Sequence, residues 1–134
     1  MNKQNGFHLF EILIVLCIMG ILAAFSIPRY SEYMVKSHRL EAEITLKKLA
    51  AAMEQLYTEH NTYEGATLEN LGFTTFIAKN SYQLKILNIT HSAYTLLADP
   101  QGIQAEKDML CGTLTLDALG EMKIGGTGQV ADCL

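Results

Sequence analysis

The chain has 134 residues, a formal net charge of −4 at pH 7, and 49% hydrophobic residues. This length predicts one domain with enough apolar residues to form a core. From Tyr57 onward there are four lysines and nine aspartates or glutamates, so the C-terminal part is acidic. An acidic surface disfavours generic binding of nucleic acid, which requires clustered positive charge.

The apolar residues are concentrated near the N-terminus. The segment from Phe7 to Ile27 is almost unbroken hydrophobic sequence, with Glu11 as its only charged residue. As a helix, it would rise about 31 Å, which is enough to cross the hydrocarbon core of a bilayer. The composition therefore predicts a hydrophobic anchor followed by a polar head.

Three interpretations of this segment compete. It resembles a cleaved signal peptide, with Lys3 before the apolar run and a small-x-small site at Ala24–Ser26. It also fits a plain membrane anchor, with the C-terminal head outside the cell by the positive-inside rule. The third interpretation is a short polar leader that ends at Gly6, followed by Phe7 and a hydrophobic helix with an acid at its fifth position.

Glu11 distinguishes among these interpretations. A carboxylate in an apolar helix costs ~2–3 kcal/mol at the bilayer centre and less near its edge. A signal peptide gains nothing from this acid, whereas a subunit that assembles through the helix can pair it with a cation. The natural partner is the α-amino group that cleavage after Gly6 would create on Phe7. The alternative is that Glu11 simply lies at the membrane surface.

Two runs of sequence carry a resemblance to a known family. They are GFHLFEILIV from Gly6 to Val15 and GILAAFSIPRY from Gly20 to Tyr30. Both resemble the N-terminal signature of type IV pilins, which is Gly, Phe, a small or polar residue, two apolar residues, and then Glu and a hydrophobic stretch. His8 replaces the usual Thr, and Phe10 the usual Ile or Val.

The resemblance implies how the N-terminus is processed. A prepilin peptidase would cut between Gly6 and Phe7 and methylate the new amine of Phe7. Glu11 would then pair with the Phe7 amine of a neighbouring subunit, so that neither buried charge stays uncompensated. The implied organisation is a leader (residues 1–6), a transmembrane and filament-core helix (7–30), and an amphipathic helix with a globular head (31–134).

Pro28 lies where the hydrophobic segment ends. It either ends the helix or kinks it, because proline lacks an N–H and clashes with the preceding turn. The kink is favoured, because helical periodicity continues from Ser31 to about His60. Apolar residues recur there at spacings of three and four, which predicts a stripe that packs on a sheet. The stripe is Ala42, Leu46, Leu49, Met53 and Leu56, and the charges assigned to the other sides are Arg39, Glu43, Lys47, Lys48 and Glu54.

The second half of the chain predicts a loop followed by strands. Periodicity is lost over residues 61–80, and strands are expected at residues 82–86, 93–98, 110–117 and 122–124. Asp99 and Pro100 are expected to stop the second of these strands. Glycines at 125, 126 and 128 predict a flexible loop. A long helix packed on a small antiparallel sheet gives an α+β architecture, the pilin fold.

Cys111 and Cys133 bracket a C-terminal loop of 21 intervening residues. In an exported domain this pair predicts a disulfide, which would contribute ~3 kcal/mol by closing the loop; two free buried thiols are the alternative. Cys17 lies in the hydrophobic run and is expected to be inert. The head, over residues 82–121, also resembles minor pilins, including the DNA-uptake group.

No catalytic constellation, cofactor motif or metal-ligand spacing is evident, and no enzyme activity is expected. Asp99, Glu106 and Asp108 are close in sequence, but they lack the spacing of an EF-hand loop, so a solvated acidic loop is expected instead.

The predicted function is therefore a structural subunit of a type IV pilus, more specifically a minor pilin, that supports adhesion, twitching motility or DNA uptake. It would be a single-pass protein of the bacterial inner membrane before it enters the extracellular pilus. Expected partners are other pilin subunits, the prepilin peptidase, the pilus assembly machinery and the membrane. The alternatives are a pilin receptor for DNA or a surface, with DNA disfavoured by the acidic head, and a type II secretion pseudopilin.

Overall fold

The computed structural model describes residues 6–134, so most of the predicted leader, residues 1–5, lies outside the described residues. The chain divides into two compact units, residues 1–34 and 35–134. One long helix, α1 (Leu9–His60), contributes to both units.

In the first unit, α1 exposes its apolar side chains. This part of the helix is long and apolar enough to cross a membrane. Its large apolar side chains are between 42% and 85% exposed, starting with Phe7 just before the helix. They are Phe7, Leu9, Phe10, Ile12, Leu13, Ile14, Val15, Leu16, Ile18, Met19, Ile21, Leu22, Phe25 and Ile27. An apolar surface of this extent marks a site of contact with lipid or protein.

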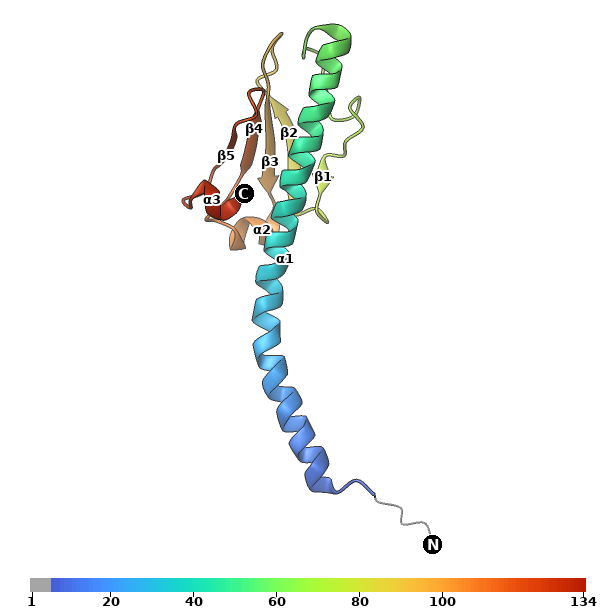
Figure 1. Cartoon of the computed structure of the whole chain (residues 1–134), viewed down its shortest axis with the longest axis vertical. Helices are drawn as coiled ribbons and strands as arrows, with labels where there is room; N and C mark the ends of the chain where they lie inside the picture. Colours follow the sequence, from blue (N-terminus) through green and yellow to red (C-terminus); the bar gives the residue numbers. More distant parts are fainter. Residues whose placement is uncertain (1–5) are drawn as a thin grey trace. The chain divides into compact units, whose positions relative to one another are not determined.

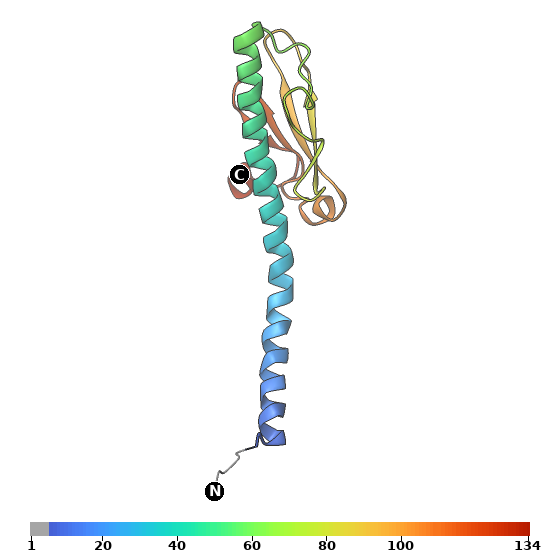
Figure 2. The same cartoon turned by 90° about the vertical axis from the view of Figure 1, so that its right-hand side faces the viewer.

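In the second unit, the C-terminal half of α1 packs along one face of a five-stranded antiparallel sheet, as Figures 1 and 2 show. The order in the sheet is the order in the chain: β1 (Phe76–Ile77), β2 (Tyr82–Leu87), β3 (Thr95–Pro100), β4 (Leu114–Asp117) and β5 (Met122–Ile124). Two short helices complete the unit, α2 (Gly102–Lys107) and α3 (Val130–Cys133). The predicted α+β class is confirmed.

The core forms where the helix stripe meets the inward side chains of the sheet. Ala42, Leu46, Leu49 and Met53 are fully buried, as their spacing predicts. The inward positions of the central strands alternate with outward ones and lie opposite each other across the ladders. The pairs are Leu84 with Ala98, Ala98 with Leu114, and Leu96 with Leu116.

Four strand boundaries differ from the sequence prediction: both ends of β3, the start of β4 and, by one residue, the end of β2. β3 begins at Thr95 and continues through Asp99 and Pro100, which we expected to stop it. Pro100 pairs with Tyr82 of β2, but the β3–β4 ladder ends at Ala98. The missing N–H of Pro100 therefore removes no ladder bond, because on the side of β3 that faces β4 no strand residue lies opposite Pro100. β4 starts at Leu114; of the four residues before it, 110 and 111 belong to a turn, and 112 and 113 belong to neither a helix nor a strand.

Three short elements were not predicted. The two-residue strand β1 lies within the expected loop, and α2 and α3 follow β3 and β5. Each is too short to produce a periodic pattern that could be recognised in sequence. In Figure 1, α2 and α3 lie at the end of the sheet where α1 enters the second unit.

Candidate functional site

Glu11 occupies the third position of α1, in the first helical turn. Its Oε2 atom accepts a hydrogen bond from the backbone N–H of His8 at 3.4 Å, and its own N–H donates to the His8 carbonyl at 2.9 Å. This reciprocal capping provides a partner for a terminal N–H and places the carboxylate at the positive end of the helix dipole. Gly6 and Phe7 precede the helix and are exposed.

Pro28 lies inside α1, which continues to His60. The helix therefore does not end at Pro28, and the kink stays a prediction. Because proline has no N–H, the carbonyl of Ala24 lacks its usual helical donor. Nearby, the Ser26 hydroxyl donates to the Leu22 carbonyl at 2.8 Å, which satisfies a polar group inside the apolar segment.

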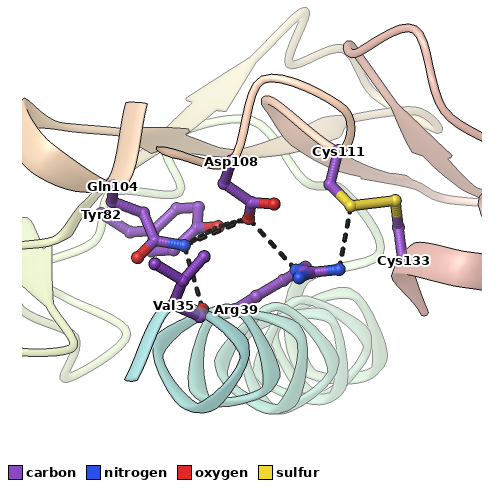
Figure 3. Close-up of a disulfide and its surroundings, with 7 residues drawn as sticks. All are labelled: Val35, Arg39, Tyr82, Gln104, Asp108, Cys111 and Cys133. Carbon is purple, nitrogen blue, oxygen red and sulfur yellow. Dashed lines mark hydrogen bonds and ion pairs between the residues drawn. A yellow bond between two sulfur atoms is a disulfide. The ribbon is translucent and has the colours of Figure 1, made fainter. Parts of the chain in front are cut away.

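In the second unit, a buried ion pair joins α1 to the turn that carries Cys111 (Figure 3). Nε of Arg39 lies 3.1 Å from Oδ2 of Asp108, and the two side chains are 11% and 5% exposed. This Nε lacks hydrogen-bond geometry, so charge attraction holds the pair. Nη1 of Arg39 donates to Sγ of Cys111 at 2.9 Å. Removal of either charge would leave the other uncompensated in the interior.

Neutral donors complete the shell around Asp108. The Tyr82 hydroxyl donates to Oδ2 of Asp108 at 3.3 Å, and burial raises the pKa of Tyr82 to about 12, which keeps this donor protonated. Nε2 of Gln104 lies 3.1 Å from three acceptors: Oδ2 of Asp108, the Tyr82 hydroxyl and the Val35 carbonyl. Figure 3 shows these groups converging from α1, α2 and β2. They fix α2 against the start of the head portion of α1.

The sequence interpretation of Arg39 and Asp108 was wrong. Arg39 was assigned to a solvated side of the helix and Asp108 to a solvated acidic loop, but both are buried. A signal was present for Arg39, because it lies three residues before Ala42 and therefore continues the core stripe towards the N-terminus. Asp108 carries no comparable signal, because its loop has no periodicity.

The other two acids that raised the question of calcium do not join Asp108. Asp99 pairs with Lys85 at 3.1 Å, and Glu106 is exposed on α2. Among the described residues, no group of three or more His, Cys, Asp or Glu side chains is arranged to hold a metal ion.

Cys111 and Cys133 form a disulfide, as the sequence predicts, and Cys17 is free and exposed. The glycines between them were expected to form a flexible loop. Instead, the N–H groups of Gly126 and Gly128 donate to the carbonyls of Cys111 and Leu110 at 3.0 and 2.7 Å. A Cβ at Gly126 would lie 2.2 Å from the Leu110 carbonyl oxygen, so only glycine permits this close approach.

A second polar cluster lies at the C-terminal end of α1. Oε1 of Glu54 accepts hydrogen bonds from the hydroxyls of Tyr63 at 2.8 Å and Tyr94 at 3.2 Å. The Tyr63 ring packs against those of Tyr57 and Tyr94, each at 4.7 Å between centroids. Burial raises the pKa of Tyr63 to about 12, and the nearby Glu54 carboxylate contributes a smaller part of this rise. The same two causes raise the pKa of Tyr94 even more. This cluster holds the loop after α1 against the core.

Known proteins are similar to this chain over about half of its length. The type IV major alpha-pilin of Moraxella bovis is 42% identical over 79 residues, which are 55% of this chain and 50% of that protein. The type IV major pilin protein PilA of Myxococcus xanthus is 37% identical over 71 residues, 53% of this chain and 32% of that protein. The chain thus spans between a third and a half of the length of these relatives.

The head matches minor pilins. A crystal structure of the non-core minor pilin PilV of Neisseria meningitidis has the same fold, with a TM-score of 0.57 and 23% identity over 75% of this chain and 94% of that one. Residues 28–115 match the family described as "Type IV minor pilin ComP, DNA uptake sequence receptor". This match covers more than half of the chain and includes the buried ion pair and strands β1 to β3. The chain therefore belongs to this family of type IV minor pilins.

Proposed function

We propose that this chain is a structural minor subunit of a type IV pilus. The observation that carries the proposal is the contrast within α1, which buries one stripe in the head but exposes the whole apolar segment before it. At about 25 cal/mol per Å² of apolar area, exposing so many large side chains to water is strongly unfavourable. Lipid would cover them in the precursor, and the helices of other subunits would cover them in the filament.

The proposed maturation begins with cleavage between Gly6 and Phe7. The support is that both residues lie outside α1 and are exposed, and that, chain neighbours apart, no heavy atom of the described residues lies within 4 Å of where a Gly6 Cβ would be. A peptidase can bind an uncrowded segment of this kind. The cut would separate a leader (1–6) from the filament-core helix (7–30) and the head (31–134), and the new Phe7 amine would be methylated.

Glu11 is the proposed assembly contact. In the uncut chain its carboxylate is held by the His8 N–H at the start of α1. Cleavage would create a positive amine on Phe7, and the carboxylate of Glu11 would pair with the Phe7 amine of a neighbouring subunit. Pairing both charges within the filament removes the penalty that each would have alone in an apolar medium. The proposed location is the bacterial inner membrane first and the extracellular pilus afterwards.

The partners follow from this sequence of events. They are other pilin subunits, the prepilin peptidase and the inner-membrane assembly machinery. Pro28 would allow α1 to bend or loosen during packing, because it interrupts the helical hydrogen-bond ladder.

The test replaces Glu11 by Gln in cells and measures the amount of the subunit in sheared filaments and in membranes. Glu32→Gln is the matched control, since Glu32 is an exposed acid on the same helix beyond the apolar run. We expect Glu11→Gln to remain in the membrane with a folded head and Glu32→Gln to enter filaments. Equal incorporation of both variants would contradict the pairing.

DNA binding is the second candidate, and the observation that favours it is the description of the matched family as a DNA uptake sequence receptor. The acidic balance of the head disfavours it. The test is the fluorescence anisotropy of labelled duplex DNA mixed with the full chain in detergent, at low and at physiological salt. Binding that weakens steeply as salt rises would support this function, and no binding at low salt would reject it.

A further inference from the structure

The two sulfurs of the Cys111–Cys133 bridge have different surroundings. Nη1 of Arg39 donates to Sγ of Cys111 at 2.9 Å, and Figure 3 shows the guanidinium directed at this end of the bridge, with Cys133 beyond it. The two cysteines are 4% and 7% exposed. The cation therefore contacts the Cys111 end of a mostly buried disulfide.

Access to the bridge comes from the other end. A surface pocket of about 260 Å³ lies between α1 and the C-terminal residues 132–134. Among the described residues, Cys133 and Arg39 line this pocket and Cys111 does not. A small molecule that enters the pocket would meet Cys133 first.

This asymmetry matters for thiol–disulfide exchange. A thiolate attacks one sulfur, and the other sulfur departs as a thiolate, faster when that leaving thiolate is better stabilised. A neighbouring guanidinium favours the thiolate form of a cysteine. Attack at Cys133 would thus expel the Cys111 sulfur directly onto Arg39, whereas attack at Cys111 would expel a Cys133 thiolate without that contact.

We propose that the bridge is a directional site for exchange with small thiols, in which Cys133 is attacked from the pocket and Cys111 leaves as a thiolate held by Arg39. In the opening step, the thiolate of the small molecule forms an S–S bond with Cys133 as the Cys111–Cys133 bond breaks. The electron pair goes to Cys111, and no external oxidant is needed. In the reverse step, the Cys111 thiolate attacks the mixed disulfide on Cys133 and releases the small thiol.

Asp108 modulates how strongly Arg39 stabilises the departing Cys111 thiolate. Its carboxylate lies 3.1 Å from Nε of Arg39 and offsets part of the guanidinium charge. The Nη1 edge remains directed at sulfur, so one guanidinium serves both groups. Neutralising Asp108 should therefore leave more positive charge for the departing Cys111, and neutralising Arg39 should remove it.

The first experiment identifies which sulfur is attacked. The full chain with Cys17→Ala, in detergent, is treated with β-mercaptoethanol, a neutral thiol, and then blocked with N-ethylmaleimide. Peptide mass spectrometry locates the two labels. We expect the mercaptoethanol adduct on Cys133 and maleimide on Cys111. The reverse assignment, or equal amounts of both adducts, would overturn the proposal.

The second experiment separates a role in exchange from a role in folding. The rate of opening by β-mercaptoethanol is compared in Arg39→Gln, Asp108→Asn and the control Lys123→Gln, whose side chain is exposed in a pair with Glu121 away from the pocket. We expect opening to slow roughly threefold or more in Arg39→Gln, to quicken in Asp108→Asn, and to stay unchanged in the control.

A purely structural ion pair predicts a different pattern. Both Arg39→Gln and Asp108→Asn would then loosen the head and quicken opening, and that result would overturn the proposal. Arg39→Lys keeps the charge and should open at a rate closer to that of the parent chain than Arg39→Gln does. If Arg39→Gln fails to fold, the adduct position in the parent chain decides the matter.

Discussion

The two halves of α1 differ in which side chains they bury: the first half exposes its apolar side chains, and the second half buries an apolar stripe together with a charged residue. In the first unit, large apolar side chains are exposed, and the acid Glu11 accepts a hydrogen bond from the backbone at the helix start. In the second unit, the stripe residues Ala42, Leu46, Leu49 and Met53 are fully buried, and even a charged residue, Arg39, lies inside. Within the described residues, contacts cover the stripe of the second half and leave the apolar side chains of the first half exposed. The partners proposed for the first half are therefore lipid and other subunits.

The largest expected effect comes from breaking the buried pair in the second half. Arg39→Met leaves Asp108 uncompensated and should lower the free energy of unfolding by about 3–5 kcal/mol. Lys123→Met removes an ion pair with Glu121 in which both side chains are exposed, and should cost less than about 1 kcal/mol. Urea unfolding of the chain in detergent, followed by tyrosine fluorescence, measures both. If both variants lost similar free energies of unfolding, burial would not determine how much an ion pair contributes to stability.

Matched leucines on the two halves sharpen the comparison. Leu49 is fully buried and Leu13 is 56% exposed. Leu49→Ala should lower the free energy of unfolding of the head by about 2–5 kcal/mol, because it leaves a cavity. Leu13→Ala should leave that value unchanged and instead reduce incorporation into filaments. A stability loss from Leu13→Ala would mean that the first half packs against its own chain.

Cysteines offer a third comparison between the halves. Cys133→Ser opens the bridge and should cost about 3 kcal/mol of head stability by the loop-entropy estimate. Cys17→Ser, on the exposed half, should cost nothing measurable in the same urea titration. A head that keeps its full stability without the bridge would show that the glycine loop is held by the backbone bonds to Leu110 and Cys111 alone.

The smallest effect concerns pH. The pKa of Tyr63 is raised from its usual 10.0 to about 12 in the folded chain. Below pH 10, both folded and unfolded chains keep this proton, so stability does not depend on it. Between about pH 10 and 12 the unfolded chain releases the proton first, so stability falls as pH rises. Tyr63→Phe should weaken this fall in urea titrations across that range, and an unchanged slope would exclude Tyr63 as its source.

The fold was predictable from sequence where periodicity was strong. The stripe from Ala42 to Met53 and the alternation in β2 and β4 identified the helix, the sheet and most of the core. Both ends of β3 and the start of β4 were missed because strand limits depend on which strand lies opposite, as for Pro100.

The polar cluster was not predicted, because a charged residue was assumed to be solvated. Arg39 continues the core stripe, which local sequence shows, but its partner Asp108 is 69 residues away and is placed by tertiary structure alone. The glycines at 126 and 128 were misinterpreted because the part of the chain that they contact is likewise placed by tertiary structure. Their role is a close approach to the backbone of Leu110, which composition does not reveal.

The central claim is that the exposed half of α1 becomes the core of a filament after cleavage at Gly6. The most direct test is intact-mass and N-terminal peptide mass spectrometry of protein sheared from the cell surface. We expect a mature chain that starts at methylated Phe7 and is two hydrogens lighter because of the Cys111–Cys133 bridge. A chain that retains Met1, or one that starts near Ile27, would contradict it.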